Sequence, residues 1–151
     1  MNWDEYFINI METVASKSKD PRTKVGAVVV GPNNEIRSTG FNGFPIGVKD
    51  TIERYSNREL KYKYVSHADA NCIYFAARNG VKLEGCRMYL PWYPCTDCTK
   101  AIIQSGIKEV VLDGKNWEEK TEHWKDWKES MDISVSMLAE ANVNLRVYPR
   151  K

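Results

Sequence analysis

Apolar residues recur at helical spacing near the start of the chain, at Phe7, Ile10, Met11 and Val14. Polar residues fill most of the positions between them. This pattern predicts an amphipathic helix over residues 3–18, with one side packed on a core.

A run of small and β-branched apolar residues spans 25–30, and a second strand-like segment spans 36–41 after a turn at 32–34. Together they predict a β-hairpin. Because the first segment is almost continuously apolar, we expect it to lie inside a sheet. The polar stretch at 42–65 is rich in Gly, Pro, Lys, Arg and Tyr, and its length is typical of a functional or disordered loop.

The second half of the chain alternates between helical and strand patterns. We expect Ser66 to cap a helix over 67–79 that ends at Asn79 and Gly80. Beyond it we expect a strand at 87–90, a helix at 96–105, a strand at 108–112, a helix at about 130–140 and a strand at 144–148. The strand-helix-strand unit predicts parallel strands with a right-handed crossover. The full order indicates an α/β fold, in which helices cover both faces of one sheet.

Composition limits the possible classes of protein. With 151 residues, of which 42% are hydrophobic, the chain is expected to form a single domain, 1–151. Its 22 basic and 20 acidic residues nearly balance, so it lacks the strong basic excess of a dedicated polynucleotide binder, while a small anionic substrate remains compatible. The sequence has neither a signal-peptide pattern nor an apolar run of about 20 residues, so we expect no membrane contact and a cytoplasmic protein.

The cysteines indicate a metal site more than a disulfide framework. Cys95 and Cys98 form a C-x-x-C pair preceded by Pro94, whereas Cys72 and Cys86 are expected to pack in the core. His67 completes a set of one imidazole and two thiolates. Three such ligands leave one tetrahedral position open, as in catalytic zinc sites, although a structural site or coincidence remains an alternative.

The predicted helices would place these ligands at two helix N-termini. The positive ends of helix dipoles favour anionic thiolates. The segment His67-Ala68-Asp69 with the later Pro-Cys-x-x-Cys matches the signature H-x-E…P-C-x-x-C of zinc nucleobase deaminases at every position except Asp69.

The chain resembles the zinc-dependent cytidine and deoxycytidylate deaminases over nearly its whole length. It is most similar to the deoxycytidylate (dCMP) deaminases. Further similar stretches lie at 18–21, 24–27, 40–47 and 103–110. The Gly-aromatic-Asn-Gly-x-Pro loop and the long insertion before the histidine are the marks that transfer-RNA adenosine deaminases lack. The resemblance implies a cytidine-deaminase-like three-layer α/β/α fold with a five-stranded mixed sheet.

The resemblance implies that His67, Cys95 and Cys98 bind Zn²⁺ and that Asp69 is the general acid and base. The implied reaction is hydrolysis at C4 of dCMP to give dUMP and ammonia, which feeds thymidylate synthesis. It also implies a homo-oligomer, with a hexamer favoured, activated by dCTP and inhibited by dTTP with Mg²⁺. The cytoplasm would be that of a bacterium, or of the host if a phage encodes the chain.

Several residues are candidates for contacts with a nucleotide, each with an alternative. The resemblance makes Asn42 a contact to the sugar or base, although a left-handed turn residue is the alternative. Backbone groups at Ala68 could read the base edge, and Tyr93 could stack on the base or simply pack. Arg22 and Lys24 could hold the 5′-phosphate or be solvated charges.

Three further residues are candidates for an effector site or a subunit boundary: Gly43, Asp50 and Arg78. The alternative for Arg78 is an ordinary exposed side chain on the motif helix.

Asp69 is the one departure from the signature. An aspartate is one methylene shorter than a glutamate, and a misplacement of about 1 Å at a reacting centre can cost about 100-fold in rate. The sequence leaves three interpretations: a natural variant whose backbone compensates, a substitution introduced to slow turnover, or a carboxylate that coordinates zinc directly. The functional alternatives are therefore a deaminase of another base, nucleoside or transfer-RNA adenosine, and an impaired nucleotide-binding form.

Overall fold

The computed structural model describes residues 1–150, without the side chains of residues 123 and 124. In chain order the elements are α1 (Trp3–Ala15), β1 (Gly26–Val30), β2 (Ile36–Phe41), α2 (Ile52–Ser56), α3 (Arg58–Tyr64), α4 (Ala68–Asn79), β3 (Arg87–Leu90), α5 (Thr96–Gln104), β4 (Glu109–Asp113), α6 (Trp117–Trp124), a 3₁₀ turn (Lys125–Trp127), α7 (Lys128–Glu140) and β5 (Asn144–Tyr148).

The five strands form one mixed sheet in the order β2-β1-β3-β4-β5. β1 pairs antiparallel with both β2 and β3, while β3, β4 and β5 run parallel. The structure therefore confirms the predicted hairpin, the interior place of its first strand and the parallel strand-helix-strand unit.

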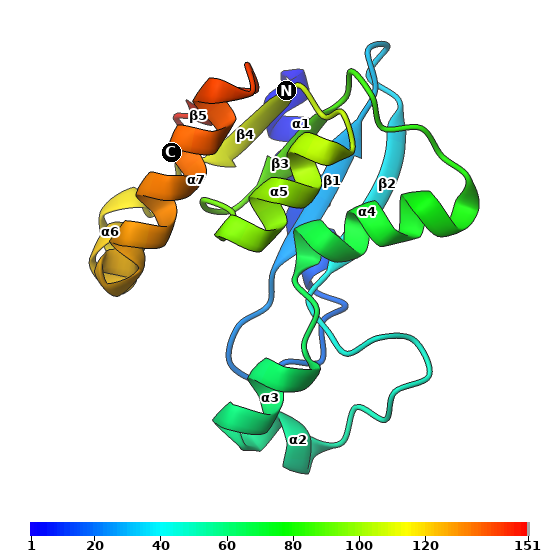
Figure 1. The fold of residues 1–151 in the computed structure, drawn as a ribbon, viewed down its shortest axis with the longest axis vertical. Coiled ribbons are helices and arrows are strands. Elements are labelled where there is room, and N and C mark those ends of the chain that lie inside the picture. The colour runs from blue at the N-terminus through cyan, green and yellow to red at the C-terminus, as the bar shows by residue number, and fades with distance from the viewer. Residues whose placement is uncertain (151) are drawn as a thin grey trace.

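The sheet lies between two layers of helices, with α1 on one face and α4, α5 and α7 on the other (Figure 1). Alternate residues of β1 supply the two cores. Ala27 and Val29 pack in the cluster below α4 and α5, and Val28 and Val30 pack against Phe7 of α1. The three-layer α/β/α prediction is confirmed, as is the burial of Cys72 and Cys86, which are free thiols.

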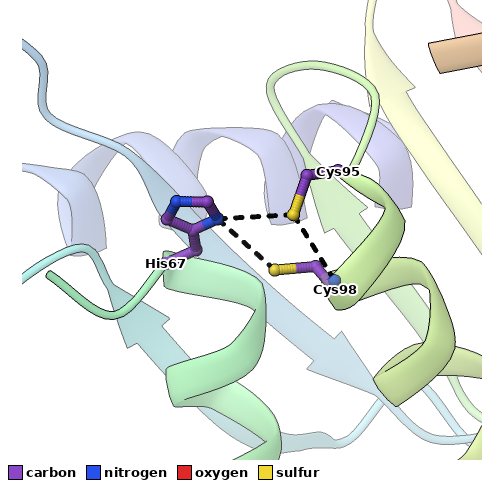
Figure 2. A group of neighbouring side chains, drawn as sticks. All are labelled: His67, Cys95 and Cys98. Carbon is purple, nitrogen blue, oxygen red and sulfur yellow. Dashed lines mark hydrogen bonds between the residues drawn. The ribbon is translucent and has the colours of Figure 1, made fainter. Parts of the chain in front are cut away.

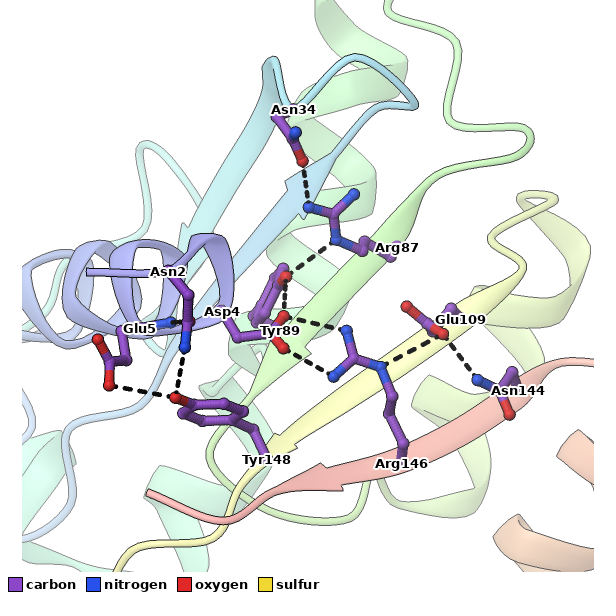
Figure 3. Close-up of polar contacts among 10 residues, drawn as sticks. All are labelled: Asn2, Asp4, Glu5, Asn34, Arg87, Tyr89, Glu109, Asn144, Arg146 and Tyr148. Carbon is purple, nitrogen blue, oxygen red and sulfur yellow. Dashed lines mark hydrogen bonds and ion pairs between the residues drawn. The ribbon is translucent and has the colours of Figure 1, made fainter. Parts of the chain in front are cut away.

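A polar network fastens α1 to strands β3 and β5 (Figure 3). Arg146 of β5 donates through two nitrogens to the Asp4 carboxylate, at 2.8 and 3.0 Å. The Tyr89 hydroxyl of β3 donates to the same carboxylate at 2.6 Å. The network thereby joins the first helix to the last strand.

The polar stretch 42–65 is not a continuous loop, so that prediction was wrong over 52–64, where α2 and α3 form. Figure 1 shows the two helices projecting away from the sheet. The stretch is closed at its base by a pair of backbone hydrogen bonds between Gly43 and Ser66, of 3.1 and 2.8 Å. The insertion thus begins and ends beside the predicted metal motif.

The N-cap of α4 is His67 and not Ser66, so the predicted cap was wrong by one residue. The C-terminal end was predicted correctly, because Gly80 adopts the left-handed conformation there with φ of 69°. α1 ends at Ala15, three residues earlier than expected. Among residues 1–150, none of the helices combines the length and apolarity needed to cross a bilayer.

α4 lies directly on β2. A Cβ atom on Gly40 would lie 2.4 Å from the backbone nitrogen of Cys72 and 2.5 Å from the carbonyl oxygen of Ala68. Only a glycine allows this approach, which sets the position of the first turn of α4 and therefore of His67.

Candidate metal centre

The structure brings the three predicted metal ligands together at the start of two helices (Figure 2). His67 is the N-cap of α4 and Cys95 is the N-cap of α5. Nδ1 of His67 lies 3.6 Å from Sγ of Cys95 and 3.5 Å from Sγ of Cys98. The three ligand atoms lie within 4.8 Å of one another.

These separations fit a tetrahedral zinc ion. Zinc binds nitrogen at about 2.1 Å and thiolate sulfur at about 2.3 Å, which at a tetrahedral angle places the two ligand atoms about 3.6 Å apart. One imidazole and two thiolates also make the donor set of a catalytic site with an open position. The residues present therefore fit Zn²⁺.

The local helices stabilise a thiolate at Cys95. The backbone N–H of Cys98 donates to Sγ of Cys95 at 3.4 Å, so the sulfur itself caps α5. Hydrogen bonding from Cys98 and from His67 lowers the pKa of Cys95 to about 4. The side-chain hydrogen bond to Cys95, together with burial, raises the pKa of the Cys98 thiol, and the side-chain hydrogen bond to Cys95 raises the pKa of His67.

Asp69 lies on the first turn of α4 with its side chain buried. One carboxylate oxygen accepts a hydrogen bond from the backbone N–H of Ala70 at 3.1 Å. Burial raises the pKa of Asp69 above the usual value for an aspartate. Among the described residues, the group of mutually close ligand atoms does not include the Asp69 carboxylate.

Asn42 is buried and its side-chain amide holds a neighbouring loop. Its oxygen accepts from the backbone N–H of Val25 at 2.8 Å, and its nitrogen donates to the carbonyl of Thr23 at 2.8 Å. The alternative of a left-handed turn residue was wrong, since Asn42 does not have a positive φ. Asn42 therefore joins the end of β2 to the segment that enters β1.

The two candidate phosphate ligands, Arg22 and Lys24, are both exposed. The ammonium of Lys24 donates to the carbonyl of Ser18 at 2.7 Å. Lys24 also lines a cavity of about 240 Å³ between α1 and the ends of β3 and β4, which Lys115, Lys120 and Arg150 help to line.

The candidate contacts to the base lie close to two of the ligands along the chain. Ala68 follows His67 and is buried. Tyr93 is half-buried, and its ring lies 5.2 Å from that of Trp92 and 5.9 Å from that of Trp117. Packing against these two tryptophans fixes Tyr93 in the connection that leads to Cys95.

The candidates for an effector or interface site lie in two parts of the fold, the segment between β2 and α2 and the helix α4. Gly43 is bonded through its backbone to Ser66, and Asp50 forms an exposed ion pair of 2.8 Å with Lys19. Arg78 is exposed near the end of α4, about 16 Å from His67 along the helix axis. Gly43 and Asp50 thus belong to the one segment that joins β2 to α2, whereas Arg78 lies near the C-terminal end of α4.

Sequence reasoning missed two residues that support this region. Asn71 bonds the carbonyls of Phe41 and Ser66, and its spacing of one helical turn from His67 was the available signal. The ammonium of Lys120 donates at 3.0 Å to the carbonyls of both Pro91 and Asp113. Nothing in the sequence pattern indicated this second contact, because α6 itself was not predicted.

Comparison with known proteins agrees with the fold and the ligand group. The model of the cytidine and deoxycytidylate deaminase zinc-binding region matches residues 1–113. An uncharacterized deaminase in the luxG 3′ region of Aliivibrio fischeri is 39% identical over 147 residues, covering 97% of this chain and 94% of that protein. Human deoxycytidylate deaminase is 39% identical over 127 residues, covering 81% of this chain and 70% of the human protein.

A solved structure extends the likeness to the whole fold. The dCMP deaminase of cyanophage S-TIM5, in complex with dCMP and dUMP, superposes with a TM-score of 0.73 at 25% identity, covering 96% of each chain. Fold and comparisons together define a deaminase, a hydrolase that removes an amino group, and its ligand group fits the zinc-binding family whose model it matches. The chain belongs to the cytidine and deoxycytidylate deaminase family.

Proposed function

We propose that this chain catalyses the zinc-dependent hydrolytic deamination of dCMP to dUMP and ammonia. The observation that carries the proposal is the placement of His67, Cys95 and Cys98 at zinc-ligand separations, with the buried Asp69 one residue beyond Ala68. The likeness to proteins named deoxycytidylate deaminase supports dCMP as the substrate.

His67, Cys95 and Cys98 would hold the zinc. A zinc ion bound there supplies a water molecule whose pKa is lowered to about 7, so that it is a nucleophile at neutral pH. The N-termini of α4 and α5 stabilise the negative charge of the thiolates.

Asp69 is proposed to move the proton. Its carboxylate takes a proton from the attacking water and passes it to N3 of the ring as the C4–O bond forms. It then takes the proton of the new hydroxyl group and passes it to the amino group as the C4–N bond breaks. Ammonia then leaves. Because Asp69 is shorter than glutamate, its reach depends on the backbone position of the first turn of α4.

The substrate contacts are proposed on both sides of this centre. Asn42 would bind the sugar or the base, backbone groups at Ala68 would bind the base edge, and Tyr93 would stack on the base. Arg22 and Lys24 would attract the 5′-phosphate by charge. The support for these roles is the burial of Asn42 and Ala68, the place of Tyr93 in the connection that leads to Cys95, and the exposure of the two cations.

A substrate panel tests the proposal. Zinc-loaded chain is given dCMP, CMP, deoxycytidine, adenosine, guanine and a transfer-RNA stem-loop, and ammonia release is measured. The proposal predicts a kcat/KM for dCMP at least about tenfold above the others, equivalent to about 1.4 kcal/mol of transition-state binding. Equal activity on deoxycytidine, or a preference for adenosine, guanine or RNA, would overturn dCMP as the substrate.

Regulation and assembly are part of the proposal. By likeness to its family, the chain would form a homo-oligomer, with a hexamer favoured, and would respond to dCTP as activator and dTTP as inhibitor with Mg²⁺. Gly43, Asp50 and Arg78 are the proposed effector or interface residues. Sedimentation, together with dCMP turnover in the presence of each triphosphate with and without Mg²⁺, tests this part.

The proposed setting is a single domain over 1–151 in the cytoplasm, without polynucleotide or membrane partners. The test is a titration with single-stranded DNA at low salt. We expect no binding, because a polynucleotide binder would bind strongly at low salt and lose affinity steeply as the salt concentration rises.

A second candidate function follows from the shorter carboxylate of Asp69. In this version the chain binds dCMP but turns it over poorly or not at all. Calorimetric binding of dCMP without ammonia release, recovered as activity in Asp69→Glu, is the result that would favour it.

A further inference from the structure

Asn71 holds the two peptide groups that flank His67. Its backbone N–H donates to the carbonyl of His67 at 2.9 Å, which is the first hydrogen bond of α4. Its side-chain Nδ2 donates to the carbonyl of Ser66 at 3.1 Å. One residue thus fixes the peptide before His67 and the peptide after it.

The same side-chain nitrogen also reaches the sheet. Nδ2 of Asn71 donates to the carbonyl of Phe41, the last residue of β2, at 2.8 Å. An amide NH₂ group has two protons, so both are used by these two carbonyls. The side chain therefore ties the end of β2 to the residue that precedes His67.

The side-chain bonds of Asn71 lie where the insertion 44–65 meets the metal centre. Ser66 pairs with Gly43 through two backbone hydrogen bonds, and the insertion 44–65 leaves and returns at this pair. Without the Asn71 side chain, the peptide before His67 would still be held by the Gly43–Ser66 pair and by the start of α4. The carbonyl of Phe41 would lose this donor, and the carbonyl of Ser66 would keep only the backbone N–H of Gly43.

We propose that Asn71 is a positioning residue for the metal centre, setting the backbone of His67 so that Nδ1 faces the two cysteine sulfurs. This inference rests on the proposed role of His67 as a zinc ligand. Groups that orient metal ligands typically contribute about 10-fold to 100-fold in metal affinity or activity.

Two matched controls separate positioning from ordinary stability. Ser38 also joins β2 to α4, since its hydroxyl donates to the carbonyl of Cys72 at 2.7 Å in a buried setting. Asn79 is an exposed asparagine on α4 whose Nδ2 donates to the carbonyl of Phe75 at 3.0 Å. Neither contact involves the peptides of His67.

The experiment compares Asn71→Ala with Ser38→Ala, Asn79→Ala and His67→Ala in the full chain. Zinc affinity is measured by competition with a chelating dye, and Co²⁺ replaces zinc to report ligand geometry through its visible absorption. Thermal unfolding of the metal-free forms measures stability separately. Asn71→Ser, which keeps one donor, provides a milder variant if Asn71→Ala does not fold.

We expect Asn71→Ala to bind zinc about tenfold or more weakly and to shift the Co²⁺ bands, with Asn71→Ser intermediate. Ser38→Ala should lower stability but keep zinc affinity within about twofold, and Asn79→Ala should change neither. Zinc affinity and Co²⁺ bands in Asn71→Ala equal to those of Ser38→Ala would overturn the inference. If His67→Ala also keeps the zinc affinity of the unmodified chain, both the proposed metal centre and the inference are wrong. If His67→Ala loses zinc affinity but Asn71→Ala keeps it, only the inference is wrong.

Discussion

His67 and Cys95 cap two different helices, and their ligand atoms lie 3.6 Å apart. A metal ion bound between them would connect α4 to α5 through their N-termini, in addition to the apolar packing of those helices. Metal binding and folding should therefore be coupled in this chain.

Removal of zinc should accordingly lower the unfolding temperature. At a free zinc concentration of about 100 times Kd, binding contributes about 2.7 kcal/mol. For a chain of this size that corresponds to roughly 5–10 °C. Calorimetry of the metal-loaded chain and of the chain stripped by a chelator checks this, and equal unfolding temperatures for the two forms would contradict it.

Gly40→Ala should destabilise the chain by about 2 kcal/mol or more, because the added Cβ meets the backbone of α4 and overpacking is costly. Gly43→Ala is the matched control. The nearest atom to a Cβ there is the Tyr55 hydroxyl at 3.8 Å, so we expect little change in stability. Urea unfolding of both variants measures the difference, and similar midpoints for the two would count against the close β2–α4 contact.

The Asp4 network makes stability depend on acid pH. Hydrogen bonding from Arg146 lowers the pKa of Asp4 despite partial burial. The resulting stabilisation is therefore present above the unfolded pKa of about 3.9 and is lost as the pH falls through the lower folded pKa. The difference in unfolding free energy between the chain and Asp4→Asn should be constant above about pH 5 and shrink below about pH 4. A pH-independent difference would show that the ion pair does not act this way.

The ion pair between Asp20 and Lys61 fastens the insertion to the segment before β1. The two groups lie 3.1 Å apart and both side chains are mostly buried. Lys61→Ala should cost about 2 kcal/mol, the usual range for a hydrogen bond to a charged group. Lys63→Ala, an exposed lysine on the same helix, should cost less than about 0.5 kcal/mol. Thermal unfolding measures the loss of stability in the two variants. Equal losses would mean that the Asp20–Lys61 ion pair does not stabilise the fold.

The sheet could be predicted from the sequence because its strands carry strong local signals. The segments 36–41, 87–90 and 144–148 were predicted with the bounds that the structure shows. The β-branched run of β1 identified an interior strand. The fold class followed from the order of these elements.

The insertion could not be predicted in the same way. Within α2 and α3, Tyr55 is the one buried residue, so these helices have no apolar period to detect. The cap of α4 was misplaced for a different reason. Ser66 is the better cap by propensity, whereas His67 occupies the position without a side-chain capping bond, and its ring faces the cysteines instead. Functional sites are where such local rules are expected to fail.

The ligand group itself was visible in the sequence because its residue types and spacing are specific. The contacts that hold it were not visible, because they join distant parts of the chain. Asn71 bonds Phe41, which lies 30 positions earlier, and Lys120 bonds Pro91, which lies 29 positions earlier. No local pattern encodes either contact.

The most direct test of the account is turnover of dCMP by the zinc-loaded chain beside Asp69→Glu and Asp69→Asn. We predict that the chain releases one ammonia for each dUMP formed, and that Asp69→Glu is as fast or up to about 100-fold faster. Asp69→Asn, whose amide cannot accept the proton, should be at least about 100-fold slower than the chain. Failure of both the chain and Asp69→Glu to form dUMP with one zinc bound, or full activity in Asp69→Asn, would contradict the account.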